Sequence, residues 1–204
     1  MTRPPPPNPW GDRRKVRVGL MGGSFNPAHE GHRHIARLAL TLLGLDEVWL
    51  LVSPQNPLKP ETGMAPLASR LNSAQDICGA HPALRPTTIE TEMGTRYTAD
   101  TLSVLRQRFA HTRFVWLMGA DNLSGFHRWR RWESIFRLVP VAILARGPYS
   151  ARALASRTAR RFAHARLPPS RARTLWNRTA PAWVFLHTRL HAASSTAIRD
   201  RRQP

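Results

Sequence analysis

The amino-acid sequence predicts an α/β fold: one domain built on a mainly parallel sheet with helices on both faces. Along most of the 204 residues, apolar and β-branched runs alternate with segments of helical periodicity. Parallel strands need long crossover connections, and the helical segments supply them. The hydrophobic content of 42% is ordinary for a folded globular chain. Together these observations favour a Rossmann-like, doubly wound sheet.

The first half of the domain is expected to begin near Lys15. Prolines crowd the start of the chain, so residues 1–14 are expected to form an extended, poorly ordered tail and residues 15–204 the domain. The patterns then predict a strand over 15–21, a helix over 34–44 that Gly44 ends, and a strand over 47–53. A helix over 65–80 follows, and then a strand over 83–90 that Pro86 weakens.

The second half continues the same alternation. A helix is predicted over 97–110 and a strong buried strand over 113–119. After a tryptophan-rich segment, the patterns predict a strand over 141–146, an arginine-rich helix within 152–166 and a strand over 183–187. A last short helix is expected to open at Ser194.

Charge is the most unusual feature of the composition. The formal net charge is +19, and no acidic residue occurs between Glu133 and Asp200. Such an excess favours polyanionic partners. A solvated basic helix face, set partly by genomic base composition, explains it equally well, so the two interpretations stay open.

Several classes of protein are disfavoured by the sequence. The single cysteine, Cys78, excludes an internal disulfide framework and is expected to be a small core residue. No apolar run approaches the roughly 20 residues of a membrane-spanning helix. The N-terminus lacks the apolar core of a secretory signal. We therefore expect a cytoplasmic protein with no membrane partner.

The stretch MGGSFNPAHEGHRHIARLAL, residues 21–40, concentrates chemistry at one strand-to-helix turn. Gly22 and Gly23 let the backbone approach a ligand, and the following helix offers free N–H groups to an anion. His29 and His32 are three residues apart, so they share a helix face and can both reach a phosphate chain. A zinc site or ordinary structural histidines are the alternatives, but a metal site leaves the glycines unexplained.

Five segments together resemble a known family. GGSFNPAHEGH resembles the GGxFxPxHxGH signature of the HxGH nucleotidyltransferase superfamily, and SSTAIR (194–199) resembles its second signature, SSTxIR. YTADTL (97–102), GADNLSGFHRWRRW (119–132) and SPQNPLKP (53–60) resemble elements of the nicotinate-nucleotide adenylyltransferases. The resemblance runs from about residue 16 to residue 199.

The resemblance implies transfer of AMP from ATP to nicotinic acid mononucleotide, with release of pyrophosphate and without a covalent enzyme intermediate. It implies Mg²⁺ as the companion of ATP, with no protein metal ligands. The catalytic residues expected on this basis are His29, His32 and Arg199. The expected ATP-binding residues are these three with Gly22, Gly23, Ser24, Phe25, Gly119, Asp121, Arg146, Ser195 and Thr196. The expected acceptor-binding residues are Asn56, Lys59, Tyr97, Thr98, Trp129 and Trp132.

Two alternatives to this activity stay open. One is a superfamily member that transfers a nucleotide to another acceptor, such as nicotinamide mononucleotide or phosphopantetheine. The other is a basic nucleic-acid-binding module, which explains the charge but not the two phosphate motifs, so no specific nucleic acid is expected. The sequence leaves a homo-oligomer open.

Overall fold

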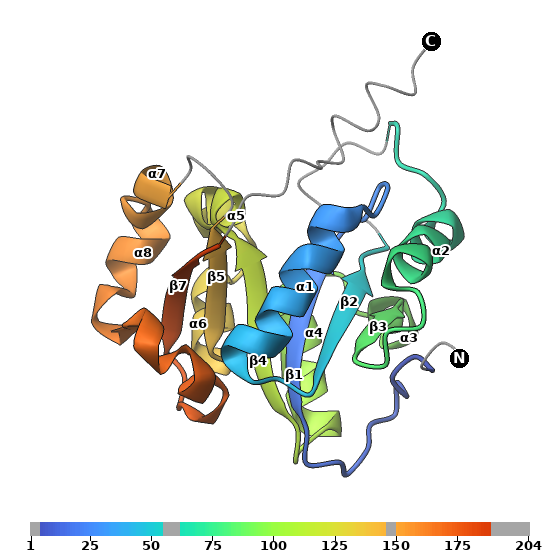
Figure 1. Cartoon of the computed structure of the whole chain (residues 1–204), viewed down its shortest axis with the longest axis horizontal. Coiled ribbons are helices and arrows are strands. Elements are labelled where there is room, and N and C mark those ends of the chain that lie inside the picture. The colour runs from blue at the N-terminus through green and yellow to red at the C-terminus, as the bar shows by residue number, and fades with distance from the viewer. Residues whose placement is uncertain (1–4, 55–61, 146–149, 189–204) are drawn as a thin grey trace.

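The computed structural model describes residues 5–54, 62–145 and 150–188. Within these ranges the chain forms one seven-stranded sheet in the order β3-β2-β1-β4-β5-β7-β6, with every neighbouring pair parallel. Figure 1 shows helices on both sides of this sheet. The predicted α/β class, with its doubly wound parallel sheet, is therefore confirmed.

The first half of the chain supplies the three strands on one side of the sheet. Its elements are β1 (Arg17–Gly23), α1 (Glu30–Leu43), β2 (Glu47–Val52), α2 (Leu67–Cys78), β3 (Leu84–Thr87), α3 (Ile89–Glu92) and α4 (Thr98–Arg108). Gly44 ends α1 in the left-handed conformation, with φ of 63°. This is the helix end that the sequence predicts, because glycine takes positive φ without steric cost.

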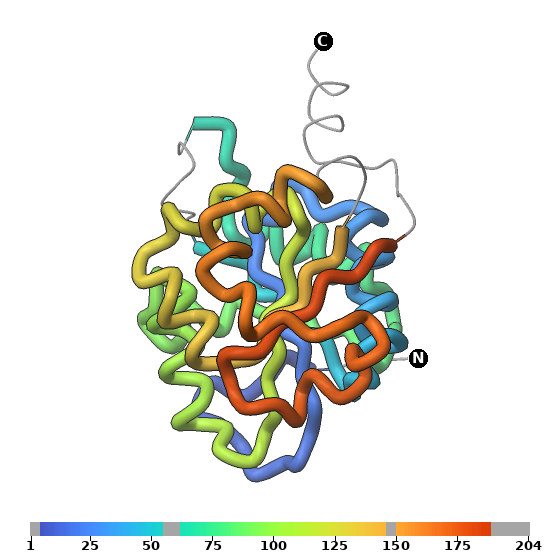
Figure 2. The backbone as a smooth tube through the Cα atoms, turned by 90° about the vertical axis from the view of Figure 1, so that its left-hand side faces the viewer, coloured from blue at the N-terminus to red at the C-terminus, as the bar shows by residue number. Residues whose placement is uncertain are grey.

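The second half supplies the other edge. Its elements are β4 (Arg113–Gly119), α5 (Ala120–Gly125), η1 (Phe126–Arg128), α6 (Trp132–Leu138), β5 (Val141–Ala145), α7 (Ser150–Leu154), α8 (Arg157–Arg161), η2 (Ala163–Ala165), β6 (Arg166–Leu167), η3 (Pro169–Asn177) and β7 (Trp183–His187). Figure 2 looks toward the sheet edge that β6 and β7 form.

Two hydrophobic cores lie on opposite faces of the sheet. One packs α3, α4, α5 and α6 against strand residues such as Trp49 and Trp116, and the other packs α1, α2 and η3 against residues such as Leu50 and Val115. Neighbouring strand residues alternate between the cores because side chains of a strand point to opposite faces. Burial on both faces explains why the central strands read as continuous apolar runs.

The sheet order also fixes where a ligand can bind. From β1 the chain continues through β2 to β3 on one side, whereas β4, β5 and β7 follow on the other. The loops after β1 and β4 therefore diverge and leave a crevice at the carboxyl ends of these strands, which is where open α/β sheets bind ligands.

Two predicted elements differ from the structure. The strand expected over 83–90 ends at Thr87, and α3 begins at Ile89, whose N–H donates a hydrogen bond to the Thr87 hydroxyl (3.1 Å). β3 is a sheet-edge strand, where Pro86 is tolerated. The single arginine-rich helix expected within 152–166 is also wrong: Ser156 separates α7 from α8 and caps α8 through its side chain.

Part of the predicted tail contacts the domain. The carbonyls of Pro5 and Pro9 accept hydrogen bonds from Arg85 and Arg108, and Arg14 pairs with the buried Glu47 (2.6 Å). These contacts connect residues 5–14 to the domain, whose expected start near residue 15 stays a prediction.

Two of the expected exclusions can be compared with the fold. Cys78 is buried at the end of α2, as expected of a core residue. In the described part of the chain, no helix has both the length and the apolar character needed to cross a membrane.

Candidate active site

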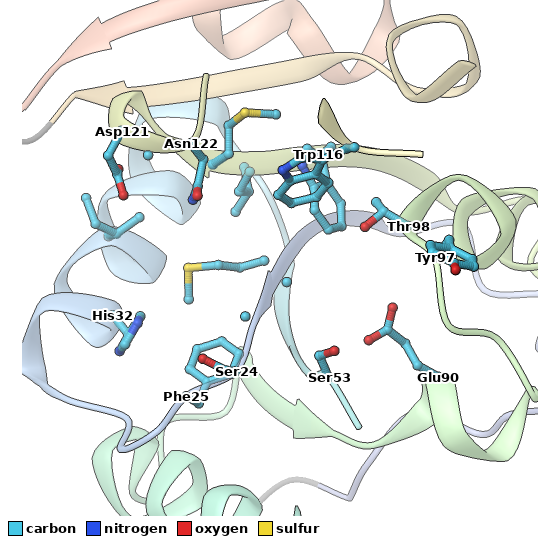
Figure 3. A pocket seen from close by; sticks show the side chains of 18 of the residues that line it. Ser24, Phe25, His32, Ser53, Glu90, Tyr97, Thr98, Trp116, Asp121 and Asn122 are labelled. Carbon is cyan, nitrogen blue, oxygen red and sulfur yellow. The ribbon is translucent and has the colours of Figure 1, made fainter. Parts of the chain in front are cut away.

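A pocket of about 520 Å³ occupies the crevice between the carboxyl ends of β1 and β4. Residues that follow four different strands line it, from Ser24 after β1 and Ser53 after β2 to Glu90 after β3 and Asp121 after β4. Figure 3 shows these side chains around the cavity, with His32 and Asp121 at one end and Tyr97, Thr98 and Glu90 at the other. The pocket therefore has two ends built from different segments.

The β1–α1 turn forms the first end. His29 is the N-cap of α1. Its ring Nδ1 accepts a hydrogen bond from the backbone N–H of Gly31 (3.1 Å), and its backbone N–H donates to Nδ1 of His32 (3.2 Å). Two backbone donors of the helix start are thus satisfied by imidazoles. Both rings line the pocket, with centroids 3.8 Å apart. The structure therefore brings both imidazoles to the same cavity at the start of α1.

These caps also determine which nitrogen carries the proton. An imidazole nitrogen that accepts a hydrogen bond is unprotonated, so the proton of each neutral ring is on Nε2. His29 and His32 can therefore act as Nε2–H donors. Together with the positive end of the 14-residue helix α1, they make this end of the pocket suited to an anion.

The glycines before this turn have a packing reason as well. A Cβ added to Gly22 would lie 2.6 Å from Cη2 of Trp116, whose ring lines the pocket. Phe25 adopts a positive φ of 48° and is 2% exposed, so its ring closes the turn against the core. Ser24 lines the pocket between them.

The second end combines aromatic and cationic groups. Tyr97 and Thr98 begin α4 and line the pocket with Trp129, which packs against Phe126 with ring centroids 4.8 Å apart. The guanidinium of Arg130 lies 4.6 Å from the Tyr97 ring centroid. This end offers flat apolar surface with positive charge beside it.

Gly119 and Asp121 lie where the sequence predicts, at the end of β4. Gly119 is the N-cap of α5, and the exposed carboxylate of Asp121 lines the pocket together with Asn122. An acidic side chain at such a strand end is in position to accept hydrogen bonds from a ribose.

Trp132 differs from the prediction. It begins α6, packs edge-on against Phe162 with centroids 5.9 Å apart, and lies at a separate surface depression beside Glu133 and three arginines. It does not line the pocket that holds Trp129. The other expected site residues lie outside the described residues: Asn56, Lys59, Arg146, Ser195, Thr196 and Arg199.

Several pocket residues were missed by the sequence analysis. They are Ser53, Glu90, Arg96, Trp116, Asn122, Arg128 and Arg130. A signal existed for some of them, because Arg128 and Arg130 flank the predicted platform Trp129. Glu90 carries no such signal, because the sequence pattern predicts a strand over 83–90 that ends at this residue.

Glu90 is the most unusual ionisable group of the pocket. Its side chain is 7% exposed, and Thr101 donates a hydrogen bond to its Oε1 (2.9 Å). Burial raises the pKa of Glu90 from 4.5 to about 7, and the Thr101 hydrogen bond lowers it by less. A carboxyl with this pKa changes charge near neutral pH.

Arg70 holds the loops of the pocket from behind. This α2 residue is 2% exposed and donates to four backbone carbonyls: Ser24 (2.8 Å), Ser53 (2.6 Å), Pro54 (2.9 Å) and Ala65 (2.9 Å). Burial lowers the pKa of its guanidinium from the ordinary value. One side chain therefore ties the β1–α1 turn to the segment after β2.

A metal cage built by the protein does not occur among the described residues, where no group of three or more His, Cys, Asp or Glu side chains could hold an ion. An ion that arrives on the phosphates of a nucleotide keeps most of its ligands as phosphate oxygens and water, and such an ion needs no protein cage.

Comparison with known proteins identifies close relatives. The family model "Cytidylyltransferase-like" matches residues 20–201. A protein of Cereibacter sphaeroides named "Probable nicotinate-nucleotide adenylyltransferase" is 54% identical over 182 residues, which cover 89% of this chain and 95% of that protein. One of the same name from Caulobacter sp. (strain K31) is 52% identical over 186 residues, covering 91% and 98%.

A solved structure shares the fold. The Plasmodium falciparum nicotinic acid mononucleotide adenylyltransferase complexed with NaAD has a TM-score of 0.67 at 15% identity, over 91% of this chain and 83% of that one. At this identity the likeness shows that the two chains have the same sheet architecture.

Proposed function

The chain belongs to the cytidylyltransferase-like family, and from this premise we propose that it transfers AMP from ATP to nicotinic acid mononucleotide, forming nicotinic acid adenine dinucleotide and pyrophosphate in NAD biosynthesis. The chain is thus a nucleotidyltransferase enzyme. Relatives more than 50% identical over nearly the whole chain carry the name of this activity. The observation that carries the proposal is the two-ended pocket, with anion donors at one end and aromatic, cationic groups at the other.

The chemistry requires no protein nucleophile. A phosphate oxygen of the mononucleotide attacks the α-phosphorus of ATP, and the bond between that phosphorus and the bridging oxygen breaks as pyrophosphate leaves with the electron pair. The attacking phosphate is already ionised at neutral pH. The protein's task is therefore to align two anions and to stabilise the charge of the transition state.

The histidine pair is assigned to that charge. Nε2–H of His32 donates to an α-phosphate oxygen, and Nε2–H of His29 donates to a neighbouring phosphate oxygen. Gly22, Gly23 and the N-terminus of α1 allow the phosphates to approach the backbone. Ser195, Thr196 and Arg199 are expected to hold the β- and γ-phosphates, and Arg146 is expected to close over the adenine.

The opposite end is assigned to the acceptor. Trp129 supplies a flat surface for the pyridinium ring, a contact that stabilises by about 0.5 to 2 kcal/mol. Tyr97 and Thr98 border the ring, and Asn56 and Lys59 are expected to contact the acceptor. Asp121, which lies toward the phosphate end (Figure 3), is assigned instead to a ribose hydroxyl of ATP. Trp132 has no part in this assignment, because it packs outside the pocket.

A divalent ion accompanies ATP in this scheme, and we assign it as Mg²⁺. It neutralises charge on the phosphates. In this assignment the ion is held largely by phosphate oxygens and water, as is usual for Mg²⁺ bound with a nucleotide.

The test is pyrophosphate release from ATP and Mg²⁺ with three acceptors offered in parallel: nicotinic acid mononucleotide, nicotinamide mononucleotide and phosphopantetheine. We expect a preference for the nicotinate acceptor and a loss of about 10²- to 10³-fold in kcat for His32→Ala. The matched control is His34→Ala, because His34 lies on the same helix but does not line the pocket.

The outcomes separate the proposals. Turnover with another acceptor keeps the phosphate assignment but overturns the acceptor assignment. No turnover with any acceptor overturns the proposed function and favours the basic binding module. A loss of activity in His34→Ala equal to that in His32→Ala would remove the specific role of His32.

A further inference from the structure

The carboxyl of Glu90 faces the pocket, and the proposed function gives it no role. It lies in α3, between β3 and α4, and Figure 3 shows its side chain pointing into the cavity between Ser53 and Thr98. Thr101 donates to Oε1, and the described residues provide no cation paired with this carboxyl. A buried carboxylate with one neutral donor is poorly stabilised in its ionised form.

The proposed acceptor is an anion, so an ionised Glu90 would repel it. Nicotinic acid mononucleotide carries a carboxylate and a phosphate, so it brings several negative charges into a pocket that already holds Glu90. An added negative charge in a partly desolvated site favours protonation of a nearby carboxylate.

We propose that Glu90 takes up a proton from solvent when the anionic acceptor binds, so that acceptor affinity is coupled to protonation of this carboxyl. The inference rests on the proposed function, because that function supplies the anion. Protonation removes the repulsion and gives Glu90 an O–H that can donate to the bound acceptor. The burial that raises the pKa of Glu90 to about 7 places this exchange within the physiological range.

The other charged residues that line the pocket do not take up the proton in place of Glu90. Arg96 and Tyr97 precede α4, Arg128 and Arg130 precede α6, and His32 and Asp121 lie toward the phosphate end. The arginines are exposed, so solvent screens them, and burial and the Thr101 hydrogen bond are what shift the pKa of Glu90. Glu92, the other acid of α3, is exposed to solvent.

The experiment is calorimetric titration of nicotinic acid mononucleotide into the full chain between pH 6.5 and 8.5, in two buffers of different ionisation enthalpy. The wild-type chain should take up protons near pH 7.5. If the acceptor raises the pKa of Glu90 by one unit, affinity falls about sixfold over this range. Glu90→Gln should bind with a pH dependence below twofold and without that uptake. Titration of the ligand's own phosphate is the same for both proteins and cancels in the comparison.

A second variant keeps the inference testable if Glu90→Gln folds poorly. Thr101→Val removes the hydrogen bond that favours the ionised carboxyl, so the fall in affinity should begin at higher pH. Thr101→Ser keeps a hydroxyl and should leave the midpoint in place.

The results distinguish three cases. Equal pH dependence in wild type and Glu90→Gln, or no change of midpoint in Thr101→Val, overturns the inference. A purely structural role would change the melting temperature of Glu90→Gln but not the pH profile of binding. A wild-type chain that fails to release pyrophosphate with this acceptor overturns the proposed function and the inference with it, whereas turnover with pH-independent affinity overturns the inference alone.

Discussion

Gly22→Ala tests whether the floor of the pocket is as tightly packed as its geometry indicates. The new methyl carbon would lie 2.6 Å from Cη2 of Trp116. Carbon atoms in contact normally lie about 3.5 to 4.0 Å apart, so the indole must move by about 1 Å. Trp116 is 2% exposed and has little room to move. Overpacking of this kind costs about 1 to 3 kcal/mol of folding stability.

The displacement has a functional consequence, because Trp116 meets Trp129 edge-on with ring centroids 6.3 Å apart. A shift of Trp116 changes its contact with Trp129 and so disturbs the surface assigned to the nicotinate ring. We expect the KM for nicotinic acid mononucleotide to rise by about tenfold, equivalent to about 1.4 kcal/mol, with a smaller change in the KM for ATP. The melting temperature should fall by roughly 2 to 10 °C.

The assay pairs steady-state kinetics with thermal melting in a double-mutant cycle. Trp116→Phe removes the atom that the methyl group would meet, so Gly22→Ala should cost less stability in that background. Trp116→Phe by itself should cost little for its size, because the buried Nε1–H of Trp116 has no hydrogen-bond partner among the described residues. Gly23→Ala is the milder control, with its nearest contact at 3.3 Å. An equal cost of Gly22→Ala in both backgrounds would refute the steric argument.

Three further predictions concern Glu90, Arg70 and the two tryptophans Trp129 and Trp132. Folded Glu90 holds a proton between its ordinary pKa of 4.5 and about 7, so its contribution to stability is lost as pH rises through this window. The free energy of unfolding of Glu90→Gln, measured relative to wild type in denaturant titrations, should therefore rise by up to roughly 3 kcal/mol from pH 5 to pH 8. A difference between the two proteins that stays constant with pH would contradict the assigned pKa. Arg70→Met should lower the folding stability by about 3 kcal/mol or more, because it removes four hydrogen bonds, and Arg70→Lys should lower it by less. Equal losses of stability for the two variants in urea unfolding would refute the guanidinium's role. Trp129→Ala should raise the acceptor KM, whereas Trp132→Ala should lower only the melting temperature; the reverse pattern would restore Trp132 to the site.

The turn between β1 and α1 can be predicted from the sequence because its determinants are local. Gly22, His29 and His32 lie within one strand-to-helix turn, and the strand before it is a continuous apolar run. The end of α1 at Gly44 is equally local, since one residue type supplies the left-handed conformation.

The acceptor end is harder to predict because tertiary contacts decide it. β3 and α3 have four residues each, too few for a period of two to be told from one of 3.6, so Glu90 was placed in a strand. The resemblance implies one shared role for Trp129 and Trp132, but Trp129 has an extended backbone before α6 and Trp132 is helical, so their rings diverge.

Long-range hydrogen bonds leave even less trace in the sequence. Arg70 binds the carbonyl of Ser24, 46 residues away, and no local pattern marks a buried arginine that is satisfied by backbone groups. The prediction of a single arginine-rich helix within 152–166 is wrong for a local reason. Its residues favour helix, but the Ser156 side chain accepts a hydrogen bond from the Ala159 N–H and starts a second helix at Arg157.

His29 joins the fold and the chemistry in one side chain, and two substitutions can separate them. Its Nδ1 caps α1, while its Nε2–H is assigned to a phosphate. Asparagine is among the best N-caps, so His29→Asn should keep most of the stability that His29→Ala loses, about 1 kcal/mol. Neither variant carries the Nε2–H donor, so both should lose about 10²- to 10³-fold in kcat. If His29→Asn regains activity together with its melting temperature, His29 acts only as a cap, and the transition-state charge must be held by His32 and the helix N-terminus.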